Sequence, residues 1–268
     1  MGGAPRDHMR RTHLHRAVCS FAIGLGAVIL GGCASAPPAR PPISAEAMAA
    51  RERLVQQWEQ FHDLRSLAEV KIRRGSRTQR FSGVILLKAP SALRVEALSP
   101  LGTPVYVVAG DATALTVWEV LDQKAYILPA TPEASQRWLG LAMGADDVVA
   151  LLAGRARPLA DAEEVELLAP DESGPSLSLR AGGRAQRIWF DPVTGQAREV
   201  QWSGGKNPAR AVFTKPSLDS PPEAVTLSTP DGKLEVSVKY RDPKMNTDFD
   251  AALVKLTVPE HVKIQDFR

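Results

Sequence analysis

The sequence predicts a mainly β protein: one large antiparallel sheet, closed or nearly closed on itself, with helices against its mouth. Two observations favour this fold. About a dozen short segments have the apolar–polar alternation or the apolar run of a strand, and turn-forming residues separate them. Helical patterns are confined to one segment before the first strand and to two adjacent segments midway along the chain. Because an antiparallel sheet of this size usually encloses a cavity, we expect a cavity as well.

The first element is a helix that we expect to run from Ser44 to about Asp63. Ser44 is a typical N-cap residue, and Ala47, Leu54 and Phe61 lie on one stripe of such a helix. Two of the strands that follow alternate strictly, whereas the second is a nearly continuous apolar run, which is typical of a strand covered on both faces. The strands expected in this half are 68–73, 81–87, 93–98, 105–109, 115–120 and 125–128.

The chain then changes to a helical pair and returns to strands. Thr131 followed by Pro132 is typical of a helix start, and we expect this helix to reach about Met143. Asp146 begins a second, short helix that Gly154 ends. The tail, 259–264, is expected to be a short extended end. The strands expected in this half are 165–169, 176–180, 187–190, 197–202, 211–214, 225–228 and 234–240.

The composition is that of an ordinary globular protein. The 268 residues are 44% hydrophobic and 24% charged, which excludes disordered and collagen-like chains. The net charge of +3 comes entirely from residues 1–32, which contain four arginines and one aspartate. The remaining chain is neutral, so we expect no nucleic-acid partner.

The N-terminus has the features of a bacterial lipoprotein signal. Arg10, Arg11 and Arg16 precede the apolar run 17–30, which is too short to span a bilayer, since a spanning helix needs about 20 residues. The run ends in Leu30-Gly31-Gly32-Cys33, which looks like a lipobox whose cysteine thiol accepts diacylglycerol. We predict a signal peptide over residues 1–32 and lipidation at Cys33; a secretory signal that happens to contain a cysteine, or an uncleaved anchor, is the alternative.

Lipidation of Cys33 would leave the mature chain without a disulfide, because Cys19 is removed with the signal. Two or three acyl chains on Cys33 would hold the protein stably on a membrane. Ala34 follows the cysteine where an aspartate would favour the inner membrane, so we expect a lipid-anchored protein of the outer membrane that faces the periplasm. Residues 33–43 are expected to be the lipidated cysteine and a Pro-rich tether, and residues 44–268 a single domain.

The sequence contains no motif that predicts catalysis. There is no P-loop, dinucleotide-binding glycine pattern, HExxH, GxSxG or paired cysteines for zinc. His62, with Asp63 beside it, is a candidate general base, but a histidine at a helix end is more often a partner of the helix dipole. We therefore expect neither an enzyme nor a cofactor nor a metal site, and we keep a hydrolase only as a remaining possibility.

Two surface features have both a functional and a structural interpretation. The run 73–80 is strongly basic; it could contact anionic headgroups, but it is more commonly a solvated hairpin. The loop Ser99-Pro100-Leu101-Gly102-Thr103-Pro104 has one large apolar residue, Leu101. This leucine could pack back into the core, the usual outcome, or project into lipid or a partner groove.

Several of these features together resemble a known family. They are the lipobox, the first helix, Phe81-Ser82-Gly83-Val84, and Leu93-Arg94-Val95-Glu96 leading into the Pro-Leu-Gly loop. The C-terminal run through Asn246, Phe249-Asp250 and Pro259-Glu260 is similar too. The chain resembles LolB-like outer-membrane lipoproteins of the LolA/LolB lipoprotein-carrier superfamily. The long acidic segment 155–175 departs from the pattern, so the receptor itself and a paralogue that handles another lipid both stay open.

The resemblance implies an incomplete antiparallel β-barrel of about eleven strands with a helical lid over an apolar cavity. It also implies a function: the cavity accepts acyl chains of lipoproteins from a periplasmic LolA-like carrier, and the protein helps insert them into the outer membrane. Leu101, flanked by Pro100 and Gly102, would be the membrane-insertion leucine of the protruding loop. The residues expected to line the cavity are Val70, Ile72, Ile85, Leu87, Val95, Val117, Trp138 and Leu139.

A second class of function stays open beside lipid transfer. A structural or scaffolding lipoprotein of the envelope would have the same anchor and the same strands, but a barrel packed solid and no transfer activity. The two hypotheses differ in one measurable property, since only a protein with an accessible apolar cavity binds an amphiphile.

Overall fold

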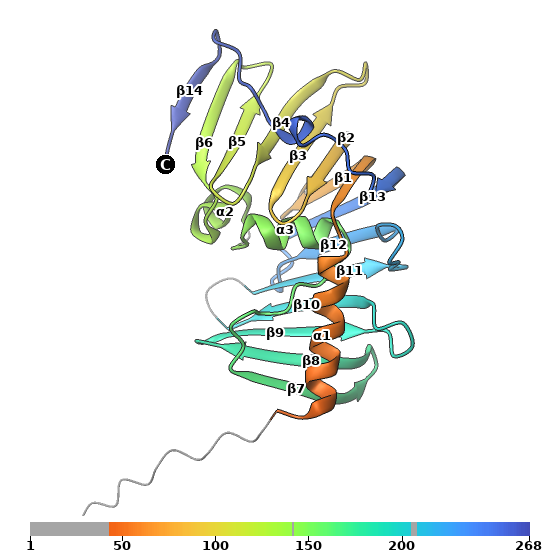
Figure 1. The fold of residues 1–268 in the computed structure, drawn as a ribbon. Coiled ribbons are helices and arrows are strands. Elements are labelled where there is room, and N and C mark those ends of the chain that lie inside the picture. The colour runs from red at the N-terminus through yellow and green to blue at the C-terminus, as the bar shows by residue number, and fades with distance from the viewer. Residues whose placement is uncertain (1–42, 141, 205–207) are drawn as a thin grey trace, which may run out of the picture. The chain divides into compact units, whose positions relative to one another are not determined.

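One sheet of 14 strands forms the framework of the protein (Figure 1). The computed structural model describes residues 43–268 apart from residue 141 and residues 205–207, and the side chains of residues 138 and 139 are not among the described parts. The predicted signal peptide, Cys33 and nearly all of the predicted tether therefore lie outside the described residues. The described residues all fall within one compact unit.

The strands of the first half form a meander that leads into two short helices. Helix α1 (Ala45–Glu59) precedes this meander, and helices α2 (Pro132–Leu139) and α3 (Ala145–Leu152) follow it. The strands are β1 (Asp63–Arg74), β2 (Arg77–Lys88), β3 (Ala92–Leu98), β4 (Pro104–Gly110), β5 (Ala114–Glu119) and β6 (Lys124–Pro129).

The second half is a further meander, and the chain ends on a strand of its own. Helix η1 (Ala251–Val254) is a short 3-10 turn before that last strand. The strands are β7 (Glu164–Asp171), β8 (Gly174–Ala181), β9 (Arg184–Phe190), β10 (Ala197–Ser203), β11 (Ala209–Thr214), β12 (Ala224–Ser228), β13 (Leu234–Met245) and β14 (Lys263–Asp266).

Two helix starts confirm their capping signals, whereas α3 begins at Ala145 after Gly144, not at the predicted Asp146, and has no side-chain cap bond. The ends of α1 and α2 correct two further predicted boundaries. The Ser44 hydroxyl accepts a hydrogen bond from the Ala47 amide, and the Thr131 hydroxyl accepts one from the Ala134 amide. Helix α1 ends before Asp63 because Asp63 already pairs with Lys88 in the sheet. Helix α2 ends before Met143 because Gly140 adopts a left-handed conformation, with φ of 82°.

The sheet is open and mixed, which corrects the predicted barrel. Its strand order is β14-β6-β5-β4-β3-β2-β1-β13-β12-β11-β10-β9-β8-β7, so β14 and β7 are its edges among the described residues. All neighbouring strands are antiparallel except β14, which pairs parallel with β6. The mainly β class and the antiparallel pairing of all strands but β14 are therefore confirmed. The predicted incomplete barrel of about eleven strands is corrected in two respects, since the sheet has 14 strands and does not close.

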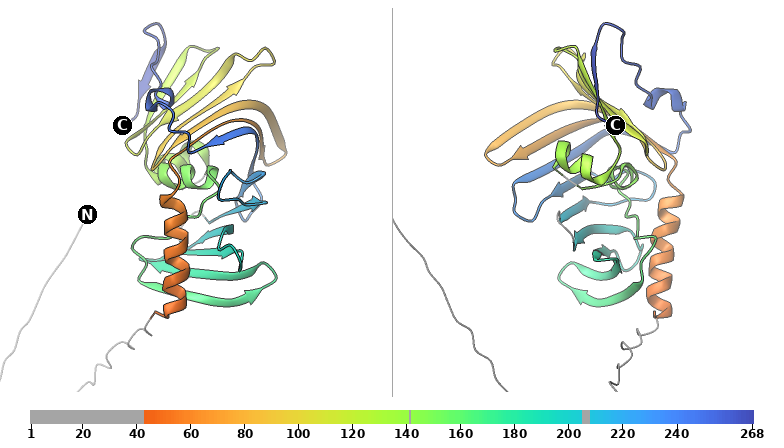
Figure 2. Two further views of the ribbon diagram at one scale, coloured as in Figure 1. Left: turned by 45° about the vertical axis from the view of Figure 1, so that its right-hand side comes forward. Right: turned by 90° about the vertical axis from the view of Figure 1, so that its left-hand side faces the viewer.

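The physical reason for the open sheet is that each half builds its own core. One cluster of buried residues joins α1 and α3 to β7–β12 and to Leu234 at the start of β13. The other joins α3 to β1, β2, β3, β5, β6 and Val238 of β13, and Val108 of β4 packs against it. Helix α3 lies between the two halves and contributes Leu151 to the first core and Val149 to the second (Figure 2). Because helices occupy the space between the halves, the edge strands are kept from meeting.

Candidate functional site

The candidate site is the inner face of strands β1–β6, by which we mean the face that packs against α3. Its deepest part is a row of leucines that the strand register brings side by side across five strands. Gly110 takes the position in this row on β4, between Leu93 and Leu115. A side chain there is excluded, because a Cβ would overlap the carbonyl oxygen of Ala114. At most 7% of any of these leucines is exposed, because they share a core with Ala145 and Val149 of α3 and with Ala153, which follows that helix. The leucine row consists of Leu64, Leu87, Leu93, Leu115 and Leu128.

The next row along the same face is apolar but only partly covered. Ile85 pairs with Val95, and the row continues through β4, β5 and β6. Ile85 is buried, whereas the other members are half-buried and pack against the edge of the same core. We call Ile85, Val95, Val108, Val117 and Tyr126 the valine row.

A third row is polar and lies nearest the strand ends that carry the β3–β4 loop. In it Ala97 pairs with Tyr106, and Tyr106 pairs with Glu119. The Tyr106 hydroxyl donates a hydrogen bond to the Glu119 carboxylate, and the Tyr126 hydroxyl lies 3.4 Å from the other oxygen of that carboxylate. Partial burial, together with the bond to Glu119, raises the pKa of Tyr106 well above its usual value. The inner face therefore changes, row by row, from buried leucine to half-exposed valine to a polar rim.

The structure places six of the eight predicted cavity residues on this inner face. Val70, Ile85 and Leu87 are buried in its core, and Ile72, Val95 and Val117 are half-buried beside it. The other two, Trp138 and Leu139, belong to α2, and their side chains lie outside the described parts. The structure brings the six together, and their role in binding acyl chains stays a prediction.

Helix α3, which covers the leucine row, is held at its C-terminal end by polar contacts that the sequence analysis missed. The Tyr240 hydroxyl donates to the Leu152 carbonyl at 2.6 Å. Arg155 is 5% exposed, and its guanidinium donates to the carbonyls of Ser217 and Leu218 at 2.7 and 2.5 Å. Burial lowers the pKa of Arg155 to about 10. No local sequence signal reveals these bonds, because their acceptors are backbone carbonyls more than 60 residues away.

The β3–β4 loop holds Leu101 out in solvent. Leu101 is 91% exposed, so the alternative in which it packs back into the core is wrong. Ser99 braces the loop: its amide donates to the Thr103 carbonyl at 2.8 Å, and its hydroxyl accepts from the amides of Leu101 and Thr103. Gly102 adopts a φ of 81°, a conformation that glycine reaches without strain. A short, internally bonded loop thus presents one leucine, and its insertion role stays a prediction.

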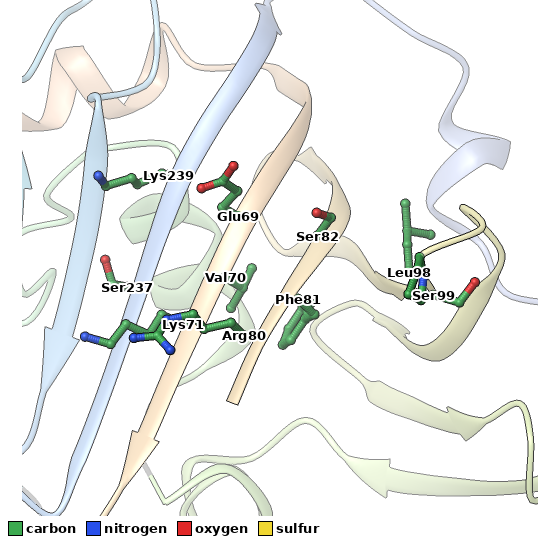
Figure 3. Close-up of a pocket in the computed structure, with 11 residues that line it drawn as sticks. Glu69, Val70, Lys71, Arg80, Phe81, Ser82, Leu98, Ser99, Ser237 and Lys239 are labelled. Carbon is green, nitrogen blue, oxygen red and sulfur yellow. The ribbon is translucent and has the colours of Figure 1, made fainter. Parts of the chain in front are cut away.

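A pocket of about 630 Å³ lies on the opposite, outer face of the sheet, beside the base of this loop (Figure 3). Three of its lining side chains are cations from adjacent strands: Lys71 of β1, Arg80 of β2 and Lys239 of β13. The sequence analysis missed this outer pocket, because β1 and β13 meet only in the folded sheet. Its other lining residues are Glu69, Val70, Phe81, Ser82, Leu98, Ser99, Pro100 and Ser237.

The remaining candidates of the sequence analysis do not form a catalytic site. His62 is exposed, and the neighbouring Asp63 carboxylate is buried, where it accepts hydrogen bonds from the amide and hydroxyl of Thr247. The basic run 73–80 forms the β1–β2 hairpin, in which Arg73 pairs with Glu235 at 3.0 Å. In the described part of the chain, no three His, Cys, Asp or Glu side chains are grouped so that they could hold a metal ion, and no helix is both long and apolar enough to cross a membrane.

Comparison with known proteins identifies the fold and not the family. No model of a known protein family matches the chain, and no curated protein matches its sequence. Among solved structures, a LolA superfamily protein from Nitrosomonas europaea has a TM-score of 0.53 at 14% identity, covering 78% of this chain and 97% of its own. A DUF1329 family protein from Desulfovibrio piger has a TM-score of 0.54 at 12% identity, with the same two coverages.

A third solved structure is a domain from Vibrio parahaemolyticus named for outer membrane lipoprotein sorting. Its TM-score is 0.52 at 9% identity, and the match covers 77% of this chain and 94% of that domain. At such identities the likeness shows a shared fold alone. The protein therefore has a fold found in the LolA superfamily, and nothing in these matches singles out LolB.

Proposed function

We propose that the protein binds lipid acyl chains on its inner face and helps insert lipoproteins into the outer membrane. The observation that carries this proposal is the graded inner face, on which a buried leucine row, a half-exposed valine row and a polar rim follow one another. An amphiphile has the same order, with an apolar chain at one end and a polar group at the other. The shared fold with a LolA superfamily protein supports the same interpretation.

The chemistry of this function is transfer without bond breaking. An acyl chain on the valine row removes apolar surface of both partners from water, and each buried CH₂ contributes about 0.8 kcal/mol. The leucine row becomes accessible only if α3 moves, because Ala145, Val149 and Ala153 cover it. We therefore infer that the chain first occupies the valine row and reaches the leucine row by displacing α3.

Delivery in this proposal uses the anchor and the exposed loop. Lipidated Cys33 would keep the protein on the periplasmic side of the outer membrane, and the tether would let the sheet approach the bilayer. Leu101 would enter the acyl layer and disturb lipid packing where the cargo is released. The expected partners are acylated lipoproteins or other lipids, and a periplasmic LolA-like carrier that brings them.

Binding of an environment-sensitive fluorescent fatty-acyl probe tests the proposal. Residues 34–268 contain every residue of both buried cores and no cysteine, so this part without Cys33 is suitable for the measurement. We expect saturable binding that a triacylated lipoprotein peptide displaces and its unacylated twin does not. Absence of binding by the folded protein would contradict the proposal and favour the scaffolding alternative.

A matched pair of variants locates the binding face. Val117→Glu places a carboxylate in the valine row, whereas Thr116→Glu places one on the opposite face of the same strand. We expect Val117→Glu to weaken probe binding at least tenfold, since a charge in an apolar groove must be desolvated when the chain binds. Thr116→Glu should bind the probe as the parent does, and equal losses in both variants would show that the inner face is not the site.

A further inference from the structure

The three cations of the outer pocket are only weakly balanced by carboxylates: Lys239 lies opposite Glu69 in the register of β1 and β13 and, after Lys215, helps to lower the pKa of Glu223. Within the described residues, Lys71, Arg80 and Lys239 take part in no ion pair and no side-chain hydrogen bond. The pocket has one carboxylate, that of Glu69, and its nearest cationic partner is Arg241 at 3.6 Å, outside the pocket. The outer pocket therefore has three cations for one carboxylate of its own, which is an excess of positive charge.

The arrangement of two of these cations is unfavourable for the protein alone. Lys71 and Arg80 lie directly opposite each other on β1 and β2, and like charges in this position destabilise a sheet. Ser82 and Ser237 line the same pocket, and their hydroxyls can donate hydrogen bonds to an anion. A phosphate group in the pocket would relieve the repulsion and find several donors.

Two of the most exposed leucines lie at the same end of the sheet as this pocket. Leu101 is at the tip of the β3–β4 loop, whose Ser99 and Pro100 line the pocket. Leu121, 79% exposed, is in the β5–β6 turn. The antiparallel order brings both connections to one end, and the amide of Val120 donates to the carbonyl of Val105 at 3.1 Å. Two exposed leucines thus lie at the same end of the sheet as the cationic pocket.

We propose that this end of the sheet docks on an anionic phospholipid surface, with a lipid phosphate in the outer pocket and Leu101 and Leu121 in the acyl layer. Charge complementarity and the two exposed leucines point to a bilayer, because a bilayer presents phosphates directly above an apolar layer. This inference goes beyond the proposed function: it adds a headgroup site on the opposite face from the acyl-binding rows, and it adds Leu121 as a second inserting residue.

The test measures docking on vesicles by residues 34–268 labelled at single cysteines. A nitrobenzoxadiazole label on Leu101→Cys or Leu121→Cys should shift to shorter wavelength and brighten with vesicles of phosphatidylcholine and phosphatidylglycerol in equal parts. The control label is on Val193→Cys, which is 90% exposed in the β9–β10 turn at the opposite end of the strands. If the labels at Leu101 and Leu121 respond no more than the label at Val193, the docking proposal is wrong.

A second matched pair tests the pocket. Lys71→Gln/Arg80→Gln removes the two opposed cations, and Arg65→Gln/Lys244→Gln removes two cations that are opposed in the same way at the other end of β1. Each basic residue near an anionic surface contributes about fivefold to binding, so the first pair should weaken vesicle binding roughly 30-fold and the second much less. Equal losses in the two pairs would overturn the headgroup site.

One variant distinguishes the docking proposal from the proposal of acyl binding on the inner face. The Lys71→Gln/Arg80→Gln protein should bind the fatty-acyl probe in solution as the parent does, because its substitutions lie on the outer face. Docking that is lost while acyl binding persists supports the headgroup site, whereas acyl binding that is lost with the same substitutions contradicts the separation of the two faces.

Discussion

At the scale of single residues, Asn246 joins the start of β1 to the end of β13. Its side-chain oxygen accepts from the amide of His62 at 2.9 Å, and its side-chain nitrogen donates to the carbonyl of Gln60 at 3.0 Å. It adopts a φ of 56°, which asparagine tolerates better than most residues. The amide therefore stabilises the junction between α1 and the sheet.

Replacing this amide should destabilise the fold measurably. Asn246→Gly keeps the backbone conformation and removes these two hydrogen bonds and a longer third one, from the Asp63 amide at 3.5 Å. We therefore expect the free energy of unfolding in urea to fall by about 1–3 kcal/mol. Asp248→Gly is the control, because Asp248 also has a positive φ, of 51°, and makes only a surface ion pair with Lys88. Equal effects of the two substitutions would show that the amide bonds contribute nothing beyond backbone conformation.

A second residue, Asp111, makes stability depend on pH. Its carboxylate accepts hydrogen bonds from the hydroxyl and amide of Thr113, and these bonds lower the pKa of Asp111 below its ordinary value of 3.8. A lowered pKa in the folded state means that the stabilisation is present above the ordinary value and lost as pH falls towards the lowered one. The Tm of Asp111→Asn should therefore fall less than the Tm of the parent when the pH is lowered from about 5 to about 2. A parallel loss in both proteins would contradict this assignment.

At the scale of elements, the position of α3 controls how much of the leucine row is accessible. The Tyr240 hydroxyl, buried against α3, bonds the carbonyl of Leu152 in its last turn, and burial raises the pKa of Tyr240 far above its usual value. Tyr240→Phe leaves that carbonyl without this donor and should lower the free energy of unfolding by about 1–2 kcal/mol. If α3 must move for an acyl chain to bind deeply, the same variant should take up the probe faster in stopped-flow measurements.

The control for this variant is Tyr106→Phe. The Tyr106 hydroxyl bonds Glu119 on the polar rim, where 41% of the residue is exposed, so its loss should change stability little. Unchanged probe uptake in Tyr240→Phe, together with the expected loss of stability, would show that α3 does not limit access to the inner face.

At the scale of the whole molecule, the open sheet needs protected edges. Strand β14 pairs with β6 over Lys263–Asp266, and Phe267 stacks on Tyr126 with ring centroids 6.5 Å apart. Removing residues 263–268 would expose the N–H and C=O groups of β6, and unpaired strand edges associate. We expect the shortened protein to self-associate with rising concentration in sedimentation measurements. Phe267→Ala keeps strand β14, so this variant should have the same association state as the parent. If the shortened protein stays monomeric, the prediction is wrong.

The sequence predicted the local parts of this fold well. The helix starts at Ser44 and Thr131 and the strand meander follow from capping chemistry and from apolar–polar alternation, which are properties of neighbouring residues. The tail 259–264 was expected to be a short extended end; only its last two residues belong to a strand, β14, and residues 260–262 form a turn and bend before it. Its parallel pairing with β6 could not be predicted, because the partner lies more than 130 residues earlier.

The candidate site, like the fold, has parts that the sequence predicted and parts that it could not predict. The sequence analysis expected Val70, Ile85, Val95 and Val117 to line one cavity, and the structure places them on one face of the sheet. The sequence left open whether Leu101 is buried or exposed, because that depends on what packs around the loop. Arg155 escaped detection altogether, since a single arginine has no periodic signal.

The sequence by itself determined the elements, the neutral composition of the chain after residue 32, and the expectation of a lipidated Cys33. Only the tertiary structure decided that the sheet stays open, that β14 joins it in parallel, and that Lys71, Arg80 and Lys239 line one pocket. The physical reason is the distance along the chain over which each interaction acts. Capping and alternation act over a few residues, whereas closure and charge clustering depend on which distant strands pair and on what fills the space between them.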